Sequence, residues 1–197
     1  MDWTCCEFRH LSSTELYMIL RARNAVLVVE DAHTYLDIDG KDEGAVHVFA
    51  LDKRTDKPAV AAYARLLAGD DIDPETTIDR WLTSAAHRDD GTIDTLVDHV
   101  LAAAHARWPD APVRTHAPAH HEAFYNRFGF RKVDGPFLEH GAPYIGMVRP
   151  VGGTSKAVRT LIKRASSAAQ AAGIESRTDS ERFVFTNRLP ADSGANR

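Results

Sequence analysis

Residues 119–130 read Ala-His-His-Glu-Ala-Phe-Tyr-Asn-Arg-Phe-Gly-Phe, and this stretch decides the fold. Phe124 and Phe128 are four positions apart, so a helix would place both on one inward face and turn Tyr125 to a different face. Gly129 is a typical residue at the C-terminal end of a helix. The pattern therefore predicts a short helix over 120–127 that ends at Gly129.

Strand-like segments lie on both sides of this helix, at residues 3–8, 46–51, 59–67, 76–83, 113–116, 130–133 and 144–148. The polar residues 52–58 between two of these segments indicate a hairpin. The order of elements is strand, helix, several strands, helix, strand, helix, strands. That order predicts an α+β fold with helices packed on a sheet.

Two longer helices are expected. The first begins at Ser12 or Ser13, which can cap a helix, with Glu15 in the first turn. Its apolar face carries Leu16, Ile19, Leu20 and Arg23, and continues towards Val26 and Leu27. The second repeats Ile93, Leu96, Val97, Val100, Leu101 and Ala104 at helical spacing and ends near Trp108.

The bulk composition excludes several classes of protein. The chain has 197 residues, of which 44% are hydrophobic and 26% charged, as expected for one globular domain. A net charge of −4 gives no general attraction to nucleic acid, and apolar runs such as 26–29 are too short to span a membrane. The start lacks a secretory signal pattern, and Cys5 and Cys6 are adjacent. We therefore expect reduced thiols and a cytoplasmic location.

The composition changes near residue 150. Residues 151–197 contain eight Lys or Arg and four Asp or Glu, a net charge of +4. We therefore expect a folded domain over 1–150 and a basic tail over 151–197. An apolar stripe within the tail predicts a helix over 154–172. Beyond it the tail is mostly polar, apart from Phe183-Val184-Phe185, and is expected to be disordered.

The 119–130 stretch resembles the late helix of GNAT acetyltransferases, which ends in a Phe-Tyr-x-x-Phe-Gly-Phe signature. Four other segments, in the same order, are similar to the ElaA-type group of that superfamily. They are Val26-Leu27-Val28-Val29-Glu30, Tyr35-Leu36-Asp37-Ile38-Asp39-Gly40-Lys41-Asp42, Tyr63-Ala64-Arg65 and Glu139-His140-Gly141-Ala142-Pro143-Tyr144-Ile145-Gly146-Met147. The resemblance implies the GNAT fold, a mixed central sheet flanked by helices.

The resemblance also implies a reaction, the transfer of an acetyl group from acetyl-CoA to an amine. The acceptor would be a small-molecule or peptide amine, and the sequence does not identify it. Tyr125 would be the general acid that protonates the leaving thiolate. The coenzyme would bind at Trp81, Leu82, Thr83, Arg88, Asp89, Asp90, Gly91, Thr92 and Ile93.

The expected pyrophosphate loop is degenerate. Arg88 and Gly91 match the family pattern of an arginine followed by glycines at a helix start, where backbone N–H groups bind anions. Ile93 replaces a small residue, and Asp89 and Asp90 place carboxylates beside a phosphate site. A helix cap explains the two aspartates equally well. The alternative function is a catalytically inactive GNAT-fold module that binds or regulates a partner.

The general base is not fixed by the resemblance. Glu30 is the first candidate, and Asp37, Asp39 and His116 are further acidic or imidazole groups on the expected acceptor side. No metal is expected. Residues 37–42 resemble a calcium loop, but Val48 stands where a closing glutamate is needed. The oligomeric state is open, with a homodimer as one alternative.

Overall fold

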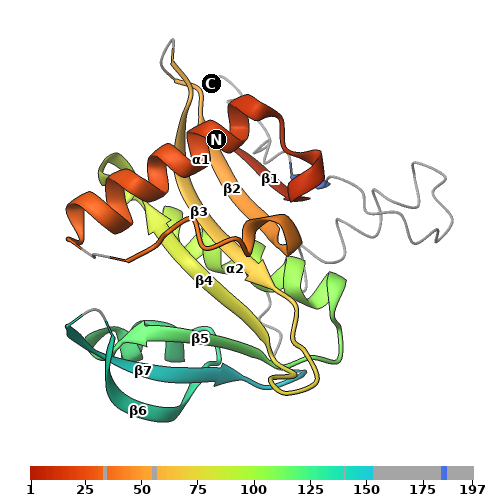
Figure 1. The fold of residues 1–197 in the computed structure, drawn as a ribbon, viewed down its shortest axis with the longest axis vertical. Coiled ribbons are helices and arrows are strands. Elements are labelled where there is room, and N and C mark those ends of the chain that lie inside the picture. The colour runs from red at the N-terminus through yellow and green to blue at the C-terminus, as the bar shows by residue number, and fades with distance from the viewer. Residues whose placement is uncertain (33–34, 55–56, 140, 153–182, 186–197) are drawn as a thin grey trace, which may run out of the picture.

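A computed structural model describes residues 1–32, 35–54, 57–139, 141–152 and 183–185 of the chain. It contains one sheet of eight strands in the order β6-β7-β5-β4-β3-β2-β1-β8 (Figure 1). The strands are β1 (Asp2–Glu7), β2 (Val46–Asp52), β3 (Ala59–Leu67), β4 (Thr76–Thr83), β5 (Val113–Pro118), β6 (Arg131–Glu139), β7 (Ala142–Arg149) and β8 (Phe183–Phe185). The helices are α1 (Ser13–Arg23), α2 (Thr92–Arg107) and α3 (Glu122–Asn126). The predicted mixed sheet with flanking helices is confirmed.

Helices α1 and α2 cover opposite faces of the sheet (Figure 1). Side chains alternate between the two faces along each strand. In β2, Val48 therefore joins a buried cluster with α2, whereas Phe49 joins a second cluster with Ile19 of α1. Burial on both faces explains why the central strands read as nearly continuous apolar runs. None of the helices in the described ranges is long and apolar enough to cross a membrane.

Helix α1 begins as predicted but changes geometry where it was expected to continue. Ser12 accepts a hydrogen bond from the Glu15 backbone, and the Glu15 carboxylate bonds back to the Ser12 backbone. After Arg23 the chain forms a π-helix over Asn24–Glu30, shown by the bond from the Asp31 N–H to the Val26 carbonyl. Such wide turns are frequent at functional sites, and this one ends beside the cavity described below.

The parallel strands β4 and β5 are paired only at their first residues. Three residues of β4, from Thr76 to Ile78, lie opposite three of β5, from Val113 to Thr115. Beyond that point the two strands diverge (Figure 1). A β-bulge causes the divergence: Ala64 of β3 faces two residues of β4, one of which is Arg80 at φ 55°.

A buried ion cluster holds this bulge. The Arg65 guanidinium, which has no exposed side-chain surface, binds Asp79 with two N–H groups at 2.8 Å each. It also binds Asp39 at 2.7 Å and Asp42 at 3.0 Å. Arg23 of α1 donates to the same Asp42 oxygen at 2.6 Å. One cluster therefore joins α1, the loop after it and β4.

Strand β6 is longer than predicted. The sequence indicated a short strand ending before the Gly135-Pro136 pair, yet β6 continues to Glu139 with two irregularities in its pairing to β7. Pro136 is tolerated because β6 is the edge strand of the sheet, so a missing N–H breaks no second ladder.

Strand β8 pairs antiparallel with β1, with Trp3 opposite Phe185. The sequence analysis did not predict this strand, because three apolar residues carry too little pattern to identify a partner about 180 residues away. The expected helix over 154–172 lies outside the described residues.

Replacing Arg65 by methionine should destabilise the domain strongly. The change leaves three carboxylates without their shared cation, and breaking a buried ion pair costs about 3–5 kcal/mol. Urea unfolding followed by circular dichroism measures the free energy of unfolding. Arg9→Ala, which removes a pair with Glu7 from an exposed arginine, is the control and should cost less than about 1 kcal/mol. Equal effects of the two substitutions would contradict the role assigned to the cluster.

Candidate active site

A cavity of about 1240 Å³ opens where β4 and β5 diverge. Alternate residues of β5, Arg114, His116 and Pro118, face this cavity, whereas Thr115 is fully buried. Helix α3 and strands β6 and β7 complete the wall opposite β4. In open sheets, ligands bind beyond the carboxyl ends of parallel strands, and this fork is such a place.

The point of the fork is fixed by a short chain of hydrogen bonds. The Trp81 indole N–H donates to the Thr115 hydroxyl at 3.0 Å, and that hydroxyl donates to the Ile78 carbonyl at 2.9 Å. Trp81 is thereby held in the opening, where its ring meets the ring of Tyr125 at a steep angle with centroids 6.0 Å apart. The indole consequently lies between the diverging strands and supports Tyr125.

Tyr125 is 6% exposed and lines the cavity. Its ring packs between Phe124 and Phe130, with centroids 5.2 and 5.8 Å away. Burial raises the pKa of Tyr125 well above that of an exposed tyrosine, so the hydroxyl stays protonated at neutral pH. Within the described part of the chain, this hydroxyl has no hydrogen-bond partner. The hydroxyl is therefore a hydrogen-bond donor at the cavity that makes no bond to another described residue.

The expected coenzyme loop leads from β4 into α2, and its arginine is paired. The Arg88 guanidinium binds the Glu30 carboxylate through two hydrogen bonds, of 2.5 and 2.7 Å, with both side chains about two-fifths exposed. These bonds lower the pKa of Glu30, which makes its carboxylate a weaker base. The candidate base and the candidate phosphate ligand thus lie together at the surface.

Asp90 lies immediately before Gly91, the residue at which α2 begins. Its carboxylate accepts the Thr92 N–H at 3.0 Å and contacts the buried His87 imidazole at 2.7 Å. These hydrogen bonds lower the pKa of Asp90 to about 2. Gly91, at φ 81°, supplies the left-handed turn that starts the helix. The Asp90 carboxylate therefore caps the Thr92 N–H of α2, and it lies where the helix start would bind an anion.

The structure brings part of the predicted coenzyme set together around the cavity. The predicted site residues that line the cavity are Trp81, Leu82, Thr83, Arg88, Ile93 and Tyr125. Ile93 is half-buried and also packs against the main core, so its bulk is shared between the core and the cavity edge. The other predicted members, Glu30, Asp89, Asp90, Gly91 and Thr92, lie beyond the lining.

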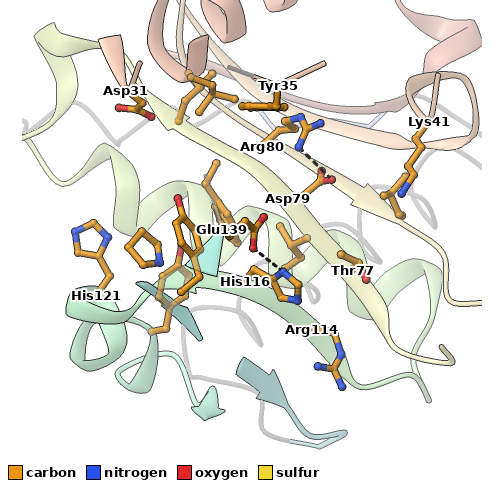
Figure 2. Close-up of a pocket in the computed structure, with 18 of the residues that line it drawn as sticks. Asp31, Tyr35, Lys41, Thr77, Asp79, Arg80, Arg114, His116, His121 and Glu139 are labelled. Carbon is orange, nitrogen blue, oxygen red and sulfur yellow. Dashed lines mark hydrogen bonds and ion pairs between the residues drawn. The ribbon is translucent and has the colours of Figure 1, made fainter. Parts of the chain in front are cut away.

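The other base candidates differ in their surroundings. Asp37 accepts a hydrogen bond from Arg23 at 2.9 Å, and Asp39 is held by Arg65, whose hydrogen bonds keep the pKa of Asp39 well below its usual range. His116, in contrast, lines the cavity and contacts the Glu139 carboxylate at 3.1 Å (Figure 2). Glu139 belongs to a motif used to identify the family, but its pairing with His116 could not be predicted from local sequence patterns.

Within the residues that the structure describes, no group of three or more His, Cys, Asp or Glu side chains could hold a metal ion. The two cysteines are buried and form no disulfide.

Comparison with known proteins identifies the family to which this chain belongs. A family described as "Acetyltransferase (GNAT) domain" matches residues 39–150. Protein ElaA from Escherichia coli strain K12 is 37% identical over 151 residues, which cover 77% of this chain and 97% of that protein. The chain therefore belongs to the GNAT family of acyltransferases, within its ElaA-type group.

Solved structures agree with this assignment. The crystal structure of an acyl-CoA N-acyltransferase from Pseudomonas aeruginosa is similar with a TM-score of 0.70 and 36% identity, covering 76% of this chain and 99% of that one. The crystal structure of Escherichia coli ElaA gives a TM-score of 0.69 with 37% identity and the same coverage. The class of donor that these matches support is acyl-CoA.

Removing the Asp90 carboxylate should tighten the binding of CoA. Asp90→Ala exposes the Thr92 N–H and removes a negative charge from the anion site, and we expect a Kd about tenfold lower, equivalent to ~1.4 kcal/mol. Isothermal titration calorimetry with CoA measures this change. Asp94→Ala is the control, because Asp94 lies in the first turn of α2 and pairs with Arg127. Unchanged or weaker binding by Asp90→Ala would show that the carboxylate does not compete with the coenzyme.

Proposed function

We propose that this protein is an N-acyltransferase that transfers an acetyl group from acetyl-CoA to a primary amine of a small molecule or peptide. The observation that carries the proposal is the Tyr125 hydroxyl, which faces the fork between β4 and β5 without a partner among the described residues. A buried, protonated hydroxyl at the carboxyl ends of two parallel strands is placed to give its proton to a leaving group.

The helix start at α2 fits the coenzyme pyrophosphate. The Asp90 carboxylate acts there as a stand-in anion, because it accepts the Thr92 N–H at 3.0 Å. The same end of the helix dipole would favour a phosphate oxygen. Arg88 adds a cation that can exchange the Glu30 carboxylate for a phosphate, since both side chains are exposed enough to rearrange.

The proposed reaction balances with the groups present. The amine nitrogen attacks the thioester carbonyl, the carbon–sulfur bond breaks, and the thiolate takes the proton of Tyr125. The amine loses one proton to a base, and transfer of that proton to Tyr125, through solvent, restores both groups. The products are an amide and the CoA thiol. Trp81 holds the Tyr125 ring at the fork through its contact with that ring and its bond to Thr115. The protein thus supplies position and proton transfer.

A second function is favoured by one feature. The chain's own carboxylates already bind both parts of the anion site, Glu30 on Arg88 and Asp90 on Thr92. An inactive module that keeps the GNAT fold would show this arrangement without ever binding CoA. Two thiols without a disulfide, Cys5 and Cys6, support a cytoplasmic location for either function.

Calorimetric titration with CoA separates the two functions. We expect the wild-type chain to bind with a Kd in the micromolar range and Arg88→Ala to weaken binding about tenfold, because a charge-assisted bond is lost. Lys53→Ala, which removes an exposed cation that pairs with Asp2, is the control and should bind as the wild type does. Absence of binding heat at millimolar CoA would exclude the acyltransferase and leave the inactive module.

Replacing Tyr125 by phenylalanine should separate binding from catalysis. The ring and its contacts remain, so the Kd for CoA should be unchanged, whereas the rate of acetyl transfer should fall about 10²-fold with the loss of the proton donor. Release of the CoA thiol from acetyl-CoA, with a panel of amines and peptides as acceptors, measures the rate. Tyr17→Phe alters an exposed tyrosine on α1 and serves as the control. A Tyr125→Phe variant with the wild-type rate would remove Tyr125 from the mechanism.

A further inference from the structure

Several charged groups around the cavity are engaged by opposite charges. Asp79 is bound by Arg65 at 2.8 Å, and Glu75 by Arg114 at 3.0 Å. Arg80 donates to Asp39 at 3.1 Å and lies over the ring of Tyr35. These ion pairs hold the walls of the cavity in place.

His116 is placed differently. It projects from β5 into the cavity, and Glu139, at the end of β6, points towards it (Figure 2). The Nδ1 atom of His116 and the Oε2 atom of Glu139 are 3.1 Å apart, and the ring of Phe137 packs against the imidazole edge to face. The Nε2 atom has no hydrogen-bond partner within the described residues.

This arrangement selects one tautomer of the imidazole. A carboxylate only accepts hydrogen bonds, so Nδ1 must carry the proton and Nε2 must carry the lone pair. The lone pair is then available in the cavity. The Glu139 charge would also stabilise the imidazolium formed when Nε2 gains a proton, as carboxylate partners do in other histidine pairs.

We propose that His116 is the general base of the reaction and that Glu139 is its positioning residue. The inference rests on the proposed function. The Nε2 atom takes one proton from the acceptor amine, directly or through one water, as the amine nitrogen bonds to the acetyl carbon. The thiolate receives its proton from the Tyr125 hydroxyl. The two proton transfers therefore use different residues of one cavity.

The competing bases are less suited. Glu30 is held by Arg88, and Asp37 and Asp39 belong to the buried ion cluster. His121 also lines the cavity, but no carboxylate of the described residues holds its ring, and burial lowers its pKa. A histidine without a partner has no fixed tautomer.

The first test is the tautomer of His116 in the full chain, read from the ¹⁵N chemical shifts of its ring by NMR. We expect the Nδ1–H form in the wild type. Glu139→Gln should shift the ring towards the Nε2–H form that is commoner in solution, because a neutral amide no longer requires Nδ1 to donate. An Nε2–H ring in the wild type would overturn the inference whether or not the protein binds CoA.

The second test compares two nucleophiles, ethylamine and hydroxylamine, with saturating acetyl-CoA. Ethylamine is protonated at pH 7, and the nitrogen of its adduct gives its proton to water only slowly, so its reaction needs a base. Hydroxylamine is largely neutral, and the nitrogen of its adduct is acidic enough to lose its proton to water. His116→Gln should lower the rate about 10²-fold with ethylamine and only slightly with hydroxylamine, a difference that a purely structural role would not produce.

His105→Gln, on α2 outside the cavity lining, is the control for both nucleophiles. Equal losses with the two nucleophiles, or a selective loss in His121→Gln instead, would overturn the assignment of His116. A wild-type chain that neither binds CoA nor reacts with either nucleophile would instead refute the proposed function.

Discussion

The Arg65 guanidinium is the contact on which the site depends. It has no exposed surface, and it binds Asp79 one residue before the bulge at Arg80. Because that bulge turns β4 away from β5, the cluster sets where the parallel pairing stops and the cavity begins. Asp42, shared with Arg23, ties α1 to the same point. An ionic cluster of this kind adds little net stability over apolar packing, but it fixes one arrangement of charged groups.

The polar groups at the start of α2, next to the cavity, differ from those at the fork in whether they already have hydrogen-bond partners. At the start of α2, the Asp90 and Glu30 carboxylates already satisfy the groups that would bind the coenzyme phosphates. At the fork and on β5, the Tyr125 hydroxyl and the His116 Nε2 atom have no partners within the described residues. Under the proposed function, coenzyme binding at the start of α2 would exchange one anion for another. Proton transfer at the fork and on β5 would use the Tyr125 hydroxyl and the His116 Nε2 atom.

Local patterns predicted much of this structure. The spacing of Phe124 and Phe128 predicted the helix α3, which carries Tyr125, and Ser12 predicted the start of α1. Both predictions were possible because helical spacing and capping involve residues only a few positions apart. The pairing of Arg88 with Glu30, 58 positions away, could not be predicted, because it depends on how the elements pack. The same holds for His116 with Glu139, 23 positions apart on different strands.

Strand β8 has a consequence for the order in which the molecule assembles. Trp3 precedes its partner Phe185 by about 180 residues in the chain, so β1 is an open sheet edge until β8 has been made. A contact with so large a sequence separation forms late, since its loop-closure entropy is offset only once both partners exist. Until that pairing forms, the backbone groups of β1 on this side have no strand to bond to, and β8 is the element that covers them.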